Sequence, residues 1–371
     1  MAKNINITST ENARKQGGYL GYNLTDSGKY NPVNGTVVRD TTATYIDEQG
    51  ILQTEQANVA RVDYTNGVAE LLLEPSSTNL FTSSEDFSQG WVITNGAFGT
   101  SQRIQSPDGK MNGFNVIVNQ GVIYFPINTN LVSGQEYTFS CYYKGNSNKT
   151  INMSHFNGTS FSGGTKTLSS EWDRFSINII ASASTNLVYI TDSRNSIFTA
   201  NDIYIWGAQI EQKGFATSYI PTNGATATRS AELVANFGSS QIINSFSGVL
   251  FFEGVFNSDT DGYLGLRGVS DLDTCQLYFK ASANNNILTI VNNVTRGEYQ
   301  TDTSVIRKYA IKYNPSDYEF YIDGVLIETN SKSLMSDMIV FSFTSGGSSN
   351  PFYGRVRQVK HLPYNTDISK L

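Results

Sequence analysis

The chain has 371 residues, enough for two or three domains. Only 16% of them are charged, and Asn, Ser, Thr and Gly replace the missing charges beside 21 Tyr and 21 Phe, a mixture that predicts many short strands joined by tight turns. The net charge of −6 argues against a nucleic-acid binder, which normally carries a basic face.

The N-terminal stretch contains no apolar run, so we expect no secretory signal. No segment approaches the roughly 18 apolar residues that span a membrane, so no membrane insertion is expected. Cys141 and Cys275 are too few and too distant for a disulfide framework or a zinc site, and we expect two small core residues.

Residues 1–78 are polar and show no helical period. VVRDTTATYIDEQGILQ (37–53) predicts two small strands around a turn at 48–50. AELLLEP (69–75) is the first firmly apolar run, and Pro75 ends it. We interpret residues 1–78 as an extended arm or a small attachment region.

From residue 79 the pattern becomes regular. In YTFSCYYK (137–144) every second residue is apolar, which predicts a strand with Tyr137, Phe139, Cys141 and Tyr143 inward and the intervening residues toward solvent. DRFSINII (173–180) repeats this period, and NDIYIWGAQIE (201–211) is more continuously apolar, as in a strand covered on both sides. Strands joined by Gly- and Asn-rich turns, without helices, predict an antiparallel sandwich or jelly roll over 79–221.

Residues 222–246 are polar and predict a connector, after which a second β region covers 247–371. Its clearest signal is Asp323-Gly324 between YEFYI and VLIE, which predicts a type I′ hairpin. The predicted fold class is therefore all-β, with two antiparallel β-sandwich (jelly-roll) domains in tandem after an N-terminal extended attachment segment.

The residues of enzymatic chemistry are sparse. His155 and His361 are the two histidines, and neither lies in a strand–elbow–helix context, so we expect ordinary surface or loop side chains. Glycosidases need two carboxylates across a cleft, and two acidic pairs are close in sequence: Glu85 with Asp86, and Asp271 with Asp273. Neighbours on a strand point to opposite faces, so spacing alone does not make a catalytic pair. We expect no catalytic residues and no enzyme.

Metal and cofactor signals are also weak. Residues 259–262 (DTDG) begin like a calcium loop, but the sixth and twelfth positions are Leu264 and Ser270 instead of Gly and Glu. No phosphate-cradling loop or dinucleotide fingerprint is present. We expect no cofactor and no metal.

Aromatic side chains beside amides and carboxylates suit carbohydrate, because a ring covers the C–H face of a sugar while polar groups bind its hydroxyls. Trp172 and Trp206 lie in or before apolar strands, which predicts core positions. Trp91 lies in the polar stretch FTSSEDFSQGWVITNG (81–96) and either packs under a loop or faces a ligand. Trp91 and three companions form the candidate glycan site, the companions being Phe98, Tyr124 and Tyr142.

Three blocks resemble the carbohydrate-binding-module-like jelly rolls of bacteriophage tail and virion fibre proteins. ARVDYTNGVAELLLEPSSTNLFTSSEDFSQGWV (60–92) resembles the opening of that module, and SPDGKMNGFNV (106–116) resembles its next element. WGAQIEQKGFATSYIPTNGATATRSAE (206–232) resembles its closing strand and the segment that follows.

The second half more loosely resembles the laminin-G or concanavalin-like sandwich of lectins and glucanases. RKYAIKYNPSDYEFYIDGVLI (307–327) and FYGRVRQVKHLPYNTDISKL (352–371) carry this resemblance. The acidic active-site motif of the catalytic glucanases is missing.

These resemblances imply a phage virion structural protein, a head or tail fibre or appendage that is assembled in the host cytoplasm. Its sandwiches would attach to host-surface or environmental glycans, and the N-terminal region would bind other virion proteins. Such fibres are usually homo-oligomers, most often trimers. Related modules often hold calcium near an acid before the last strand, here Asp202, which is equally a turn residue. The alternatives are a purely structural decoration or adaptor protein and a polysaccharide depolymerase.

Overall fold

The computed structural model describes residues 36–127, 131–192, 197–198, 202–235, 243–268, 274–281, 286–291, 294–331, 338–345 and 349–371, together with short strands at 5–8, 23–24 and 30–31; side chains are not described at 5–8, 23–24, 30–31, 97–102, 191–192, 197–198 and 339. The described part is built from strands and one 3₁₀ turn, η2 (Ile368–Lys370). None of its helices is long and apolar enough to cross a membrane.

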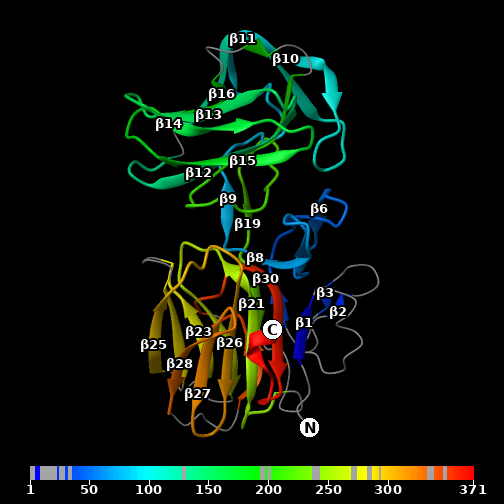
Figure 1. Ribbon diagram of the computed structural model, residues 1–371. Helices are drawn as coiled ribbons and strands as arrows, with labels where there is room; N and C mark the ends of the chain where they lie inside the picture. Colours follow the sequence, from blue (N-terminus) through cyan, green and yellow to red (C-terminus); the bar gives the residue numbers. More distant parts are fainter. Residues whose placement is uncertain are drawn as a thin grey trace. The chain divides into compact units, whose positions relative to one another are not determined.

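The chain forms two compact units, and one is inserted into the other along the sequence. Unit 2 comprises residues 50–54 and 76–229, whereas unit 1 comprises residues 1–49, 55–75 and 230–371. In Figure 1, unit 2 is cyan to green, and unit 1 combines blue with yellow to red. The all-β class with two sandwiches is confirmed, but the chain order is an insertion instead of a simple tandem.

Unit 2 is a two-layered sandwich whose main strands pair in the order β14-β13-β16-β11-β18-β12-β15, with β10 and β17 attached to β11. Its strands are β9 (Ser77–Asn79), β10 (Val92–Ile104), β11 (Gly113–Pro126), β12 (Glu136–Gly145), β13 (Thr150–Phe156), β14 (Phe161–Thr167), β15 (Asp173–Ile180), β16 (Leu187–Asp192), β17 (Ile197–Phe198), β18 (Ile203–Glu211) and β19 (Ala227–Arg229). The start of the long strand β11 pairs with β18 and its end pairs with β16, so β11 runs through both layers.

The alternation predicted for β12 is confirmed for its inward set, because Tyr137, Phe139, Cys141 and Tyr143 are at most 1% exposed in the core between the layers. The other set was predicted to face solvent, and this prediction was wrong. Thr138 and Ser140 are fully buried, since the segment after β18 lies over this face and the Thr138 hydroxyl donates to the Lys213 carbonyl at 2.8 Å.

The segments by which the chain enters and leaves unit 2 are joined to each other. Strands β9 and β19 pair antiparallel, and the hydroxyls of Thr78 and Thr228 are 2.7 Å apart. Next along the chain, the Thr222 amide donates to the Ser84 hydroxyl at 2.8 Å, and that hydroxyl lies 2.6 Å from the Tyr219 hydroxyl.

Unit 1 is a second sandwich. One sheet has the order β28-β27-β26-β21-β30-β8-β7, with β1 also pairing with β30, and the other has the order β25-β24-β23-β22-β29. The strands of the first sheet are β1 (Ile5–Thr8), β7 (Arg61–Asp63), β8 (Glu70–Leu73), β21 (Gly248–Phe256), β26 (Arg307–Tyr313), β27 (Tyr318–Ile322), β28 (Val325–Asn330) and β30 (Gly354–Leu362). Those of the second are β22 (Gly262–Gly268), β23 (Thr274–Phe279), β24 (Asn286–Val291), β25 (Val294–Gln300) and β29 (Met338–Ser342). Both sheets contribute to one aromatic-rich core.

Asp323 and Gly324 both have positive φ, 50° and 79°, as the type I′ turn requires, so the predicted β27–β28 hairpin is confirmed. Shorter strands complete the described chain: β2 (Asn23–Leu24), β3 (Tyr30–Asn31), β4 (Thr36–Val38), β5 (Ala43–Ile46), β6 (Leu52–Glu55) and β20 (Leu233–Ala235).

The observed boundaries differ from the predicted arm (1–78) and connector (222–246). Strands β7 and β8 extend the first sheet beside β30, and β20 pairs with β4 inside unit 1. A buried ion cluster holds these pieces together: the Arg39 guanidinium lies 2.8 Å from Glu232, and that of Arg61 lies 2.5 Å from Glu232 and 2.8 Å from Glu74. Residues 36–49 and 55–75 are therefore part of unit 1 instead of a separate arm.

Candidate functional site

Trp91 is a core residue of unit 2. Its ring lies 5.4 Å from Phe81, 5.3 Å from Phe87 and 5.2 Å from Phe125, and only 9% of the residue is exposed. A sugar needs an accessible ring face, and these three phenylalanines pack around the indole. Of the two predicted alternatives for Trp91, packing under the loop is therefore the one that the structure supports. Trp91 is no longer a candidate for ligand binding.

Tyr142 is also buried, with 8% exposed. Its ring contacts Trp206 at 5.6 Å and Tyr219 at 6.3 Å, and the Arg174 guanidinium lies 5.4 Å from the ring centre. Trp206 is fully buried, as predicted.

Two further predictions concern Trp172, which was expected in the core, and Phe98, which was expected in the glycan site. Trp172 is only half-buried, and its indole N–H donates to the Gln105 carbonyl at 2.8 Å. Phe98 lies on β10 opposite Val116, but its side chain is outside the described residues.

Among the predicted ligand residues whose side chains the structure describes, Tyr124 is the one that is partly exposed. It belongs to an aromatic strip, which consists of Tyr124, Phe156, Phe161 and Tyr189. The ring centres of Tyr124 and Tyr189 are 5.3 Å apart, those of Tyr189 and Phe161 are 5.5 Å apart, and those of Phe161 and Phe156 are 4.7 Å apart. Phe161 is 46% exposed, which makes it the most accessible ring of the strip.

The register of the strands explains why these rings share the outer face of the sheet. Ile123 and Val188 are fully buried in the core, so the next residues along their strands, Tyr124 and Tyr189, point outward. Phe156 and Phe161 are direct partners at the closed end of the β13–β14 hairpin.

The hairpin turn is held by one side chain. The Asn157 carboxamide oxygen accepts the amides of Thr159 at 3.0 Å and Ser160 at 2.9 Å, and Gly158 has a φ of 95°. An Asn-Gly turn flanked by two phenylalanines was thus a signal that the sequence contained and that sequence reasoning missed.

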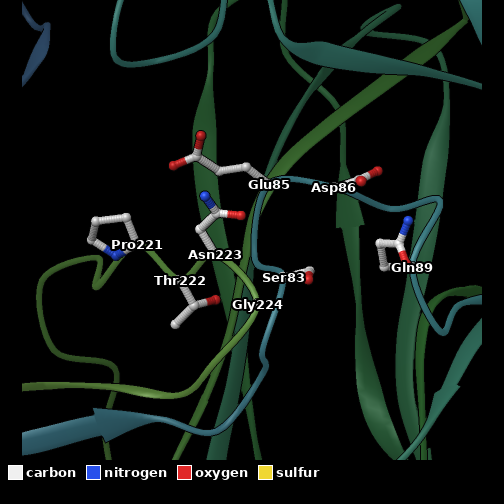
Figure 2. A pocket seen from close by; sticks show the side chains of 8 residues that line it. All are labelled: Ser83, Glu85, Asp86, Gln89, Pro221, Thr222, Asn223 and Gly224. Atoms are coloured by element: carbon white, nitrogen blue, oxygen red, sulfur yellow. The ribbon is translucent and has the colours of Figure 1, made fainter.

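A second candidate site in unit 2 is a polar pocket of about 540 Å³ between residues 83–89 and 221–224. Its lining is polar except for a proline and a glycine: Ser83, Glu85, Asp86, Gln89, Pro221, Thr222, Asn223 and Gly224. Figure 2 shows the carboxyl groups of Glu85 and Asp86 pointing away from each other, with Asn223 beside Glu85. The pair therefore does not converge on one point of the pocket.

The two carboxyl groups differ in acidity. Burial, followed by the nearby Asp108 carboxylate, raises the pKa of Glu85, which accepts hydrogen bonds from the Tyr219 hydroxyl at 3.2 Å and the Asn112 amide at 3.0 Å. The hydroxyl of Ser88 holds the pKa of Asp86 below its usual value. Since both Glu85 oxygens bind protein groups, its role in this arrangement is to join the loops of unit 2.

Both histidines are buried, so the prediction of surface or loop positions was wrong. His155 is 1% exposed, and its Nε2 lies 3.0 Å from the Asn186 side-chain oxygen. His361 is fully buried, with Nε2 at 2.7 Å from the Tyr313 hydroxyl. Both histidines lie on strands, at positions whose side chains are buried. The sequence around them did not reveal this orientation.

Cys141 and Cys275 are free and fully buried, as predicted, and burial raises the pKa of each thiol to about 12.

Within the described ranges, no group of three or more His, Cys, Asp or Glu side chains could hold a metal ion. Asp202 precedes β18 as a turn residue, with a carboxylate oxygen 3.4 Å from the Lys149 ammonium group. Asp271 and Asp273 lie outside the described residues.

No protein-family model and no curated protein matches the chain. Among solved structures, the CBM40 of the Ruminococcus gnavus IT-sialidase bound to α2,3-sialyllactose is 14% identical, covering 34% of this chain and 85% of that one, with a TM-score of 0.27. The CBM22-1–CBM22-2 tandem of Paenibacillus barcinonensis Xyn10C is 10% identical, with coverages of 77% and 96% and a TM-score of 0.28. Domains LG4-5 of the mouse laminin α1 chain are 14% identical, with coverages of 76% and 91% and a TM-score of 0.26. These scores are low, so the description of the fold rests on the strands above.

Proposed function

We propose that this chain is a glycan-binding structural protein of a bacteriophage virion, a head or tail fibre or appendage that attaches to glycans through unit 2. The aromatic strip is the observation that carries the glycan-binding part of the proposal. It places four rings together on one face of a sheet: Phe161 is 46% exposed, Tyr124 and Phe156 are partly exposed, and Tyr189 is buried beneath them at 7%.

The exposure of Phe161 supports the assignment of the strip to binding. This ring contacts Phe156 and Tyr189 but keeps nearly half of its surface exposed, and exposed aromatic rings stack on flat ligands. The virion part is supported by the resemblance of residues 60–92, 106–116 and 206–232 to the jelly rolls of phage fibres. Under this proposal the protein has no catalytic function, assembles in the host cytoplasm, binds other virion proteins and forms a homo-oligomer, with a trimer as the expected state.

The test is retention of the purified chain on immobilised polysaccharides. The panel contains bacterial surface polysaccharides together with mannan, xylan, a mixed-linkage glucan and polygalacturonate. The variants are Tyr124→Ala with Phe161→Ala for the strip, and Phe246→Ala as a matched control, because Phe246 is a 64% exposed phenylalanine of unit 1. We expect the chain to retain at least one polysaccharide and the strip variant to lose it.

Oligomeric state is measured beside retention, because linked copies raise the apparent affinity of a weak site. Normal retention by the folded strip variant would exclude the strip as the site. No retention of any polysaccharide by the assembled chain would exclude glycan binding.

A purely structural role is the second candidate, and the edge strand β28 favours it. Val325, Leu326 and Ile327 are 62%, 50% and 40% exposed on the last strand of the first sheet of unit 1. Exposed apolar edge strands readily pair with other chains. A Leu326→Lys variant that folds but no longer enters the particle or the oligomer, in a chain without polysaccharide retention, would support this role.

A depolymerase would release reducing ends from a retained polysaccharide. The Glu85–Asp86 pair does not favour this activity, since its carboxyl groups point apart. Release of reducing ends that disappears with Glu85→Gln would contradict the non-enzymatic proposal.

A further inference from the structure

The two walls of the polar pocket in unit 2 are fixed to each other by hydrogen bonds. Ser83 and Asn223 form an isolated antiparallel β-bridge. Beside this bridge, the Ser84 amide donates to the Thr222 hydroxyl at 2.9 Å, and the Thr222 amide donates to the Ser84 hydroxyl at 2.8 Å. The pocket is therefore preformed, and its volume of about 540 Å³ is within the usual range of small-molecule sites.

The charged side chains that line this pocket are both carboxylates, Glu85 and Asp86. The Ser88 hydroxyl and amide donate to Oδ1 of Asp86 at 2.6 and 3.0 Å, and these hydrogen bonds hold the pKa of Asp86 below its usual value. Asp86 is exposed and therefore presents an ionised carboxylate at neutral pH. A ligand group that carries a positive charge and N–H donors forms the strongest hydrogen bonds with such an anion.

Two cations near these acids have other partners. The Arg103 guanidinium lies over the Phe114 ring, 3.1 Å from its centre, and the Lys110 ammonium group lies 2.6 Å from the Asp108 carboxylate. Neither cation is among the residues that line the pocket. The lining therefore offers carboxylates, and no lysine or arginine, to a ligand.

The neutral polar groups of the lining suit a ligand with several hydroxyls. The Ser83 hydroxyl and the carboxamides of Gln89 and Asn223 can each donate and accept hydrogen bonds. A single metal ion fits less well, because the carboxyl groups of Glu85 and Asp86 point apart (Figure 2). A lysine side chain of another protein also fits less well, since its apolar stem would lie against this polar lining. A small molecule that combines an ammonium group with hydroxyls matches the lining best.

We propose that the polar pocket binds an amino sugar with a protonated amine, whose ammonium group pairs with Asp86 and whose hydroxyls bind Ser83 and Asn223. Glu85 keeps its role of joining the loops, because its oxygens accept hydrogen bonds from Tyr219 and Asn112. This site goes beyond the proposed function, since the pocket shares no lining residue with the aromatic strip.

The experiment compares three ligands of the full chain by ligand-observed NMR titration. Glucosamine carries both the amine and the hydroxyls, glucose carries the hydroxyls alone, and butylamine carries the amine alone. At about pH 6 the amines are protonated and Asp86 is ionised. We expect glucosamine to bind at least about tenfold more tightly than either of the other two ligands. Asp86→Asn keeps the shape of the side chain and removes its charge, so it should weaken glucosamine about tenfold, the scale of one hydrogen bond to a charged group.

Asp302→Asn is the matched control for this substitution. Asp302 is an exposed acid of unit 1, and its Oδ1 also accepts the amide and the hydroxyl of the serine two residues later, Ser304. The control therefore makes the same chemical change in the same local arrangement, away from the pocket. Glucosamine affinity should stay unchanged in Asp302→Asn and in the strip variant that combines Tyr124→Ala with Phe161→Ala.

Four results would overturn this inference. Glucose or butylamine could bind as tightly as glucosamine, glucosamine could fail to bind the full chain, folded Asp86→Asn could keep the full affinity, or the strip variant could lose it. The proposed function is tested separately by polysaccharide retention and by its loss in the strip variant. Failure of the pocket and failure of the proposed function are therefore distinguishable.

Discussion

His361 should make unit 1 sensitive to acid. Its ring is fully buried on β30 and fits against Gly248, where an added Cβ would lie 2.5 Å from Nε2. The Tyr313 hydroxyl donates its only proton to the Asn244 carbonyl at 2.6 Å, so it must accept the proton of His361 Nε2 at 2.7 Å. The other ring nitrogen, Nδ1, then carries a lone pair, and no described residue would accept a proton added there.

Burial accordingly lowers the pKa of His361 from 6.5 to about 4. The unfolded chain takes up a proton below pH 6.5, whereas the folded chain resists until pH 4, so stability is lost as the pH falls through this window. A difference of about 2.5 pKa units corresponds to about 3 kcal/mol in full, and to about 2 kcal/mol between pH 7.5 and pH 5.

The measurement is urea unfolding of the chain and of His361→Gln at pH 7.5 and pH 5. Glutamine can still donate an N–H group to the Tyr313 hydroxyl but does not titrate. The three tryptophans, Trp91, Trp172 and Trp206, all belong to unit 2, so a transition seen by circular dichroism and not by tryptophan fluorescence reports unit 1. The chain should lose about 2 kcal/mol more than the variant on acidification. Equal losses in both would refute the assignment of this acid sensitivity to His361.

Three further predictions concern stability. Trp91→Ala should cost unit 2 about 3–5 kcal/mol, the usual range for a buried tryptophan, and leave polysaccharide retention unchanged while the unit is folded; lost retention in a folded variant would return Trp91 to the binding site. Glu85→Gln should stabilise unit 2 at pH 7, because the raised pKa of Glu85 means that its charged form opposes folding above the unfolded pKa. In unfolding followed by tryptophan fluorescence, this gain in stability should disappear as the pH falls through the pKa of the folded state. A gain in stability that does not depend on pH would contradict this reasoning. Arg61→Ala should destabilise unit 1 by about 3–5 kcal/mol, because it leaves Glu232 and Glu74 buried with one partner fewer. Arg307→Ala, in the exposed Arg307–Asp323 pair, should cost less than about 1 kcal/mol. Similar costs for both variants, measured by circular dichroism during unfolding, would show that the burial of the ion pair does not decide its contribution.

Local periodicity predicted the fold class well, because it reports which side of a strand is apolar. The alternation of Tyr137 and Phe139 identified the core side of β12, and Asp323-Gly324 identified a hairpin from the φ angles that its turn demands. The same reasoning failed for Thr138, since its face is covered by a segment that follows much later in the chain. A period in the sequence does not show what lies over the other face.

The candidate site was predicted only in part, for a related reason. Trp91 has polar neighbours in the sequence, but its spatial neighbours are Phe81, Phe87 and Phe125, of which Phe125 comes from another strand. Tyr124 was named, whereas Tyr189, with which it pairs, was not, because β11 and β16 are separated by four other strands along the chain. Pairing of distant strands decides which rings share a face, and composition does not reveal it.

The insertion of unit 2 into unit 1 has a consequence for proteolysis. Residues 76–229 are tethered to the rest of the chain at both ends, and the two tethers are paired through β9 and β19. A protease that cuts one tether leaves the other covalent connection intact, and the hydrogen bonds of the pair still hold the cut end. Release of the proposed binding unit therefore requires two cleavages, whereas a domain at the end of a single linker would be lost after one.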